Sequence, residues 1–131
     1  MKEPKFRFVT EKAKRELSID FNFGYDINKS CQDWEWTIGN KNQIEEYITH
    51  YINEIDDDKK FALMEIIIQA IEDQENEKDF DKYSNGIRKL LFNNFLLHEY
   101  SIYYWSDFEN DLNDSWKISK MMREIFQDKI D

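Results

Sequence analysis

Residues 61–71 read FALMEIIIQAI, and this stretch decides the fold. Nine of its eleven residues are apolar, and the two polar ones, Glu65 and Gln69, lie one helical turn apart. Aspartates at positions 56–58 stand just before it, where carboxylates suit the unpaired N–H groups of a helix start. A helix that is apolar nearly all round is buried on most sides. The sequence therefore predicts a buried central helix over about residues 57–74.

An apolar stripe at helical spacing precedes the central helix. Its members occupy positions i, i+3, i+4, i+7, i+8 and i+11 over residues 44–55. Either Asn40 or Asn42 can cap this helix, because each has a polar partner three residues further on. We therefore expect an amphipathic helix that packs its stripe into the core.

Further helical patterns follow the central helix. Apolar residues over 80–91 predict a third helix. Gly86 lies inside it, and Gly destabilises a helix by up to about 1 kcal/mol relative to Ala, so its presence there indicates close packing against a neighbour. Ser119 is a suitable cap for a final helix. Residues 95–108 allow either a continued helix or an irregular turn with a short helix over 101–105. The fold class is mainly α, with four to five helices packed around the central one.

Residues 1–39 have a different pattern from the helical body of residues 40–131. Apolar and polar side chains alternate over residues 5–8 and again over 18–25, which is a strand signal. Between them, Thr10 can cap a short helical turn. We expect a short β-hairpin or an extended arm here, as part of one domain that spans all 131 residues.

The charge balance restricts the partners. Eighteen Lys and Arg against twenty-eight Asp and Glu give a net charge of −10. Phosphate binding needs clustered Lys and Arg, so neither nucleic acid nor an anionic membrane is an expected ligand. A basic protein is the easier partner, although acidity also serves solubility alone. The single Cys31 cannot form an internal disulfide, no signal pattern starts the chain, and the apolar runs are too short to span a bilayer; we expect a cytoplasmic protein.

No motif for a cofactor, a metal or a catalytic group stands out. The two histidines, His50 and His98, lie far apart, and neither a P-loop nor a dinucleotide fingerprint occurs. The spacing of the polar residues over 107–113 matches the first ligand positions of an EF-hand calcium loop. Leu112, however, stands where the loop requires Gly, and Ile118 stands where it requires the bidentate Glu. Weak cation binding by these acids stays open. We expect no cofactor, no dedicated metal site and no enzymatic activity.

The most distinctive stretch is residues 98–116, where six large aromatic residues lie among five carboxylates. Tyr and Trp beside acids can bind Lys and Arg through cation–π contacts and ion pairs. The alternative is that most of these rings fill the core with only their polar tips outside. The expected contact residues are Tyr104, Trp105, Asp107, Glu109, Asp111 and Asp114.

A second acidic bank is an alternative contact face. It consists of Glu72, Asp73, Glu75, Glu77 and Asp79. With either face, we expect a small acidic module that neutralises a basic partner, such as a nuclease or toxin, in the manner of an inhibitor or immunity protein. The alternatives are a non-catalytic helical scaffold or self-associating protein, and an enzyme or small-ligand carrier with a pocket near His98.

Overall fold

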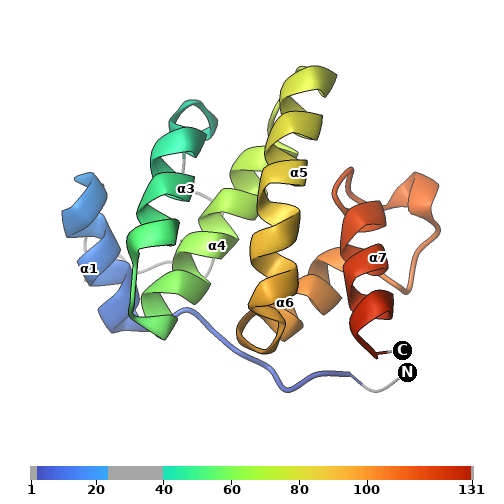
Figure 1. Ribbon diagram of the computed structural model, residues 1–131, viewed down its shortest axis with the longest axis horizontal. Helices are drawn as coiled ribbons and strands as arrows, with labels where there is room; N and C mark the ends of the chain where they lie inside the picture. Colours follow the sequence, from blue (N-terminus) through green and yellow to red (C-terminus); the bar gives the residue numbers. More distant parts are fainter. Residues whose placement is uncertain (1–2, 24–39, 131) are drawn as a thin grey trace. The chain divides into compact units, whose positions relative to one another are not determined.

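The computed structural model describes residues 3–23 and 40–130, and these residues are mainly helical (Figure 1). They form six α-helices, two short 3₁₀-helices and no strand. The chain divides into two compact units. Unit 1 consists of Met1–Arg7 and Ile71–Asp131, and unit 2 consists of Phe8–Ala70. The expected mainly-α class is thus confirmed, whereas the single domain stays a prediction.

The β-hairpin expected near the N-terminus is wrong for residues 3–23. Helix α1, Glu11–Phe21, includes residues 18–21 of the second alternating stretch, and residues 3–10 form neither helix nor strand. The Thr10 hydroxyl accepts the N–H of Ala13 at 3.1 Å, and Ala13 and Leu17 are buried one turn apart. A cap together with i, i+4 burial favours a helix over a short period-two pattern. The expected strand residues after Phe23, and Cys31, lie outside the described residues.

Helix α3, Ile44–Asn53, carries the apolar stripe, and a 3₁₀ turn, η2 (Lys41–Gln43), precedes it. Asn40 caps this turn, because its side chain accepts the N–H of Asn42 at 2.9 Å. The first part of the stripe is buried, but Ile55 is 92% exposed because the helix has ended before it. Ile52 is also exposed, although it lies on α3, so the stripe contributes to the core only from Ile44 to Tyr51.

Helix α4, Asp57–Glu72, is the expected buried helix, with nearly the expected bounds. All eight side chains from 61 to 68 are buried. Its first turn is capped by Asp56, whose carboxylate accepts the N–H of Lys59 at 2.9 Å. The packing of the other helices around it stays a prediction.

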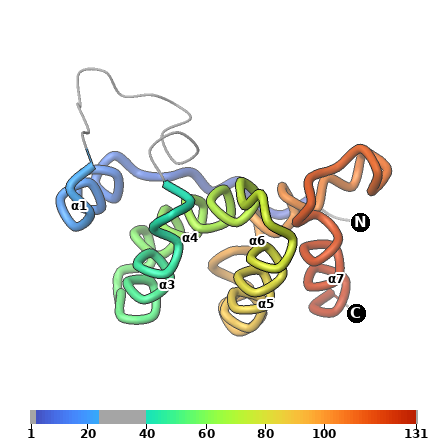
Figure 2. The backbone as a smooth tube through the Cα atoms, turned by 90° about the horizontal axis from the view of Figure 1, so that it is seen from above, coloured from blue at the N-terminus to red at the C-terminus, as the bar shows by residue number. Residues whose placement is uncertain are grey.

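Unit 1 holds helices α5 (Glu77–Asn93), α6 (Phe95–Ser106) and α7 (Ser119–Ile130), and the 3₁₀ turn η3 (Leu112–Asp114). Helix α7 lies beside α6 in Figure 1 and again in Figure 2. The Ser119 hydroxyl joins the two, because it donates to the Trp105 carbonyl at 2.7 Å. Ser119 is itself the first residue of α7, so it does not occupy the expected cap position before the helix.

Gly86 lies on the exposed side of α5. A Cβ built at this position meets no atom within 4 Å. The expectation that Gly86 marks close packing is therefore wrong. The helix continues through it, with Ser84 buried before Gly86 and Ile87 and Leu91 buried after it.

Candidate partner-binding site

The residues between α6 and α7, numbered 107–115 and here called the acidic loop, carry four of the expected contact residues. Asp107 ends α6 in the left-handed conformation with φ 51°, which turns the chain away from the helix axis. Residues 112–114 then form η3, and Ser115 donates to the Asp111 carbonyl at 3.0 Å. Local hydrogen bonds thus give the acidic loop a defined backbone path.

The Arg123 side chain, on α7, binds backbone carbonyls at the start and in the middle of the acidic loop. Its Nε donates to the Ser106 carbonyl at 2.7 Å, and its Nη2 donates to the carbonyls of Asp107 at 2.6 Å and Asn110 at 2.7 Å. The same nitrogen lies 3.2 Å from the Ser115 hydroxyl. These oxygen atoms are all carbonyl or hydroxyl, so the guanidinium positions the backbone without binding a carboxylate of the loop.

The carboxylates of the acidic loop therefore face water. Glu109, Asp111 and Asp114 are exposed, and their side chains form no hydrogen bond or ion pair within residues 3–23 and 40–130. The Asp107 carboxylate differs, because both of its oxygens lie 3.0 Å from Nδ2 of Asn110. Three of the four expected acids are available to a partner, and the fourth supports the turn.

The two expected aromatic contacts have different environments. Trp105 is only 2% exposed and packs 4.6 Å from the Trp116 ring, so it belongs to the core and offers no contact surface. Tyr104 is half-buried and stacks on Trp116 with ring centroids 5.5 Å apart. The helical spacing explains the difference, because adjacent residues on α6 point about 100° apart and only one can face the core.

One residue of the second acidic bank, Glu72, has a structural role. The Glu72 carboxylate accepts the backbone N–H groups of Lys117 at 3.0 Å and Ile118 at 3.1 Å, just ahead of α7. Glu77 and Asp79 lie in the first turn of α5, which Asn76 caps, so they already meet the positive end of that helix. The carboxylates of three of the five acids of this bank are thus placed at helix starts or just ahead of one.

Sequence reasoning missed a charge cluster in unit 2, formed by Asp20, His50, Glu54 and Lys59. Lys59 Nζ lies 2.8 Å from Asp20 Oδ2 and 3.1 Å from Glu54 Oε1. His50 Nε2 lies 3.3 Å and 3.1 Å from the same two oxygen atoms. The i, i+4 spacing of His50 and Glu54 was the available signal, but Asp20 comes from α1 and no local pattern predicts its position.

The electrostatics of the charge cluster favour ion pairing. Burial opposes ionisation of Glu54, but the N–H of Asp56, the Lys59 ammonium and His50 outweigh it and lower its pKa to about 2. Burial also opposes the charged form of Lys59, but its bonds to Asp20 and Glu54 outweigh this and raise its pKa. Both groups are therefore charged near neutral pH.

The charge cluster also has the ligand types of a metal site. One atom each of Asp20, His50 and Glu54 lies within 4.8 Å of the others. The Lys59 ammonium, however, already contacts both carboxylate oxygens that a metal ion would use. A cation at this place has to displace Lys59, so the cluster is better explained as a link between α1, α3 and the start of α4.

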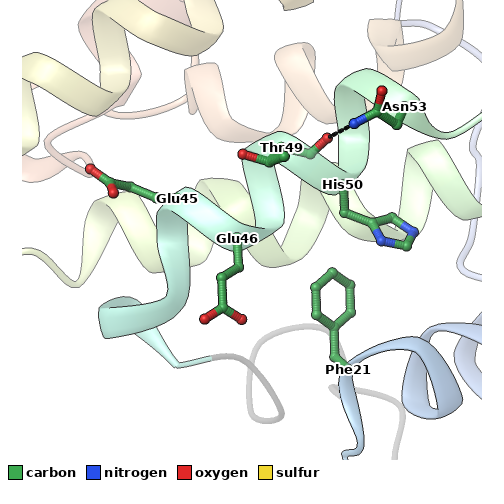
Figure 3. A pocket seen from close by; sticks show the side chains of 6 residues that line it. All are labelled: Phe21, Glu45, Glu46, Thr49, His50 and Asn53. Carbon is green, nitrogen blue, oxygen red and sulfur yellow. Dashed lines mark hydrogen bonds between the residues drawn. The ribbon is translucent and has the colours of Figure 1, made fainter.

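A surface hollow of about 480 Å³ lies next to the charge cluster in unit 2 and is here called the α3 hollow (Figure 3). His50 belongs to both, and the remaining lining comes from α3 and the last residue of α1. The lining residues are Phe21, Glu45, Glu46, Thr49, His50 and Asn53. The hollow thus combines an aromatic ring with acidic and polar groups.

His98, the residue around which a catalytic or ligand-carrying pocket was considered, is 0% exposed on α6. Its imidazole therefore offers no surface to a substrate in this structure.

The comparisons with known proteins assign no function. No family model matches the chain, and no curated protein or solved structure matches it. Within residues 3–23 and 40–130, no helix is both long enough and apolar enough to cross a membrane.

Proposed function

We propose that this chain is a non-catalytic, acidic protein-binding module that neutralises a basic partner. The contact surface is the acidic loop, with Glu109, Asp111 and Asp114 as the charged contacts and Tyr104 beside them. The single observation that carries the proposal is the Arg123 arrangement, which orders the loop through backbone carbonyls, while these three carboxylates form no hydrogen bond or ion pair within residues 3–23 and 40–130.

This arrangement matters because ordering a loop on binding weakens an interaction. Arg123 binds backbone carbonyls, so the loop is ordered before a partner arrives. The exposed carboxylates then meet the partner without first breaking internal ion pairs. Clustered negative charge also speeds association with a positively charged surface.

The partner class that fits best is a protein with a basic, phosphate-binding cleft. Carboxylates held a few residues apart can occupy positions that phosphates otherwise take in such a cleft. The net charge of −10 attracts this partner and repels nucleic acid itself. An inhibitor or immunity protein against a nuclease or toxin has these properties.

The test compares three baits in a pull-down from lysate of the source organism. They are the wild-type chain, the loop variant Glu109→Gln/Asp111→Asn/Asp114→Asn, and the control variant Asp73→Asn/Glu75→Gln/Glu77→Gln. Both variants lose three negative charges, so they differ only in where the charge is lost. We expect one basic protein to be retained by the wild type and the control and lost from the loop variant.

Salt steps complete this experiment. The Debye length decreases from about 10 Å at 0.1 M to about 3 Å at 1 M salt, so a contact through exposed carboxylates weakens over this range. Equal loss from both variants shows that only net charge matters, and full retention by the loop variant removes the loop as contact. Either result contradicts the proposal.

A second candidate function is apolar docking or self-association through unit 1. Leu96 is 87% exposed and Phe6 is 64% exposed, and both line a hollow of about 340 Å³ beside α6. Phe6 packs edge-on against Tyr100 at 5.0 Å. Sedimentation of the wild type and of Leu96→Ser at increasing concentration tests this function, which predicts a salt-insensitive oligomer that the substitution abolishes.

A further inference from the structure

The α3 hollow places a carboxylate and an aromatic ring at one opening. Glu46 and His50 lie four residues apart on α3, so their side chains leave the helix on the same side. Figure 3 shows both projecting toward the side where the Phe21 ring lies, whereas Glu45 projects away from it. The opening is thus bordered by a ring, a carboxylate and an imidazole.

The Phe21 ring is fixed by its contacts with the core of unit 2. It packs edge-on against Tyr47, with centroids 5.1 Å apart and an interplanar angle of 86°. It also stacks on Phe23 with centroids 5.6 Å apart and lies 4.9 Å from the His50 ring, so a ligand meets only the part of the ring that borders the hollow. Tyr47 is fully buried, and its hydroxyl accepts the N–H of Asn40 at 2.9 Å and donates to Gln43 at 3.0 Å. The ring therefore does not need to be ordered when a ligand binds.

The charge at this opening is negative. Glu46 is exposed, and its carboxylate forms no hydrogen bond or ion pair in the described parts of the chain. The neighbouring cation, Lys59, already binds Asp20 and Glu54, and His50 directs its Nε2 at the same two carboxylates. Among the described residues, no cation is therefore placed to pair with Glu46.

We propose that the α3 hollow binds the guanidinium group of an arginine side chain on a partner protein. A guanidinium is planar, so it can stack on Phe21 while its N–H groups donate to the Glu46 carboxylate. A lysine ammonium is compact and strongly hydrated, so it uses the ring less well. An anion is repelled by Glu46.

This inference rests on the proposed function in one respect, the basic character of the partner. The two sites nevertheless belong to different units and use different residues, so they can be tested separately. Arginine binding in the α3 hollow is measured without any partner, and the acidic loop is tested by the pull-down.

The experiment is an NMR titration of the ¹⁵N-labelled full chain with Nα-acetyl-arginine amide. The comparator is Nα-acetyl-citrulline amide, which has nearly the same shape but carries a neutral urea in place of the guanidinium. We expect saturable shifts centred on Phe21, Glu46 and His50 with the arginine compound and much weaker binding of the citrulline compound.

Two exposed-acid variants make the titration specific. Glu46→Gln removes the charge without touching the core and weakens binding by about two- to fivefold, the range for one exposed ion pair. Asp128→Asn removes an exposed charge on α7 and leaves binding unchanged. The loop variant described above also binds arginine as the wild type does.

Three results overturn the inference. They are equal binding of the arginine and citrulline compounds, unchanged binding by Glu46→Gln, and shifts spread over all exposed acids rather than centred on the α3 hollow. Normal arginine binding together with a failed pull-down contradicts only the role of the acidic loop.

Discussion

Glu72 accepts the backbone N–H of Ile118 at 3.1 Å, although the two residues lie 46 positions apart in the sequence. The second Glu72 oxygen accepts the N–H of Lys117 at 3.0 Å. The N–H groups at a helix start have no partner within the helix, and a carboxylate there also meets the positive end of the helix dipole. Glu72, the last residue of α4, therefore holds in place the two residues that lead into α7.

We predict that Glu72→Ala lowers the free energy of unfolding by about 1–2 kcal/mol, because two N–H groups lose their acceptor. Urea denaturation followed by circular dichroism measures the change. Asp128→Asn is the control, since it also removes one negative charge, and Asp128 is exposed and forms no hydrogen bond or ion pair in the described parts of the chain. Equal stability of the two variants contradicts a capping role for Glu72.

Replacement of Arg123 by Lys keeps the charge but loses the planar group that reaches several carbonyls at once. We predict a loss of about 1–3 kcal/mol in the free energy of unfolding. Amide hydrogen exchange should become faster at residues 109–115, with little change in α5. This pattern distinguishes loosening of the acidic loop from a general loss of stability.

The control for this substitution is Arg88→Lys. Arg88 lies 3.0 Å from Glu124, and both side chains are more than 40% exposed. Exposed ion pairs contribute about 0–1 kcal/mol, so this variant should keep nearly the wild-type stability and exchange rates. Faster exchange of the acidic loop in both variants argues against a specific role for Arg123.

The sequence predicts those parts of the fold that depend on local patterns. The apolar run at 61–71 and the stripe that begins at Ile44 define α4 and α3, because helical burial follows from spacing alone. The short helical turn expected after Thr10 is confirmed in α1, but the helix continues to Phe21, where alternation over residues 18–25 had suggested a strand. Where a helical pattern and a strand pattern overlap in one short stretch, burial in the folded protein decides which structure forms.

The sequence predicted the exposed acids of the candidate site but not the residues that hold its backbone in place. The carboxylates of the acidic loop are exposed, as their density suggested, whereas the assignment of Trp105 to the surface missed its burial. The role of Arg123 depends on contacts made 8 to 17 residues away, and that of Glu72 on a still longer separation. Periodicity carries no information about such pairs.

Removal of the Lys59 ammonium leaves Asp20 and Glu54 without their closest cation. We predict that Lys59→Met lowers the free energy of unfolding by about 1–3 kcal/mol near neutral pH, because two partly buried carboxylates lose a partner. Lys60→Met is the control, since the Lys60 ammonium lies 5.4 Å from the centroid of the Tyr51 ring and forms no ion pair with the described residues. A similar loss in both variants contradicts the importance of the charge cluster.

The pH dependence of this difference has a defined sign. The pKa of Glu54 is lowered from 4.5 to about 2, so its contribution is complete above pH 4.5 and is lost as the pH falls toward 2. Thermal unfolding of wild type and Lys59→Met at about pH 7 and about pH 3 should therefore show a larger difference at the higher pH. A difference that grows in acid contradicts this assignment.

Gly86 offers a stabilising substitution. Its position on α5 is exposed, its φ is negative, and a Cβ meets no atom within 4 Å. Ala restricts the unfolded chain more than Gly and suits a helix better, so Gly86→Ala should raise the free energy of unfolding by about 0.5–1 kcal/mol. Ser84→Ala serves for comparison, because Ser84 is buried and donates to the Asp81 carbonyl at 3.3 Å, so it has no such gain. Urea titrations of both variants measure the free energy of unfolding. A lower value for Gly86→Ala than for the wild type contradicts the prediction and shows that this face of α5 contacts another surface.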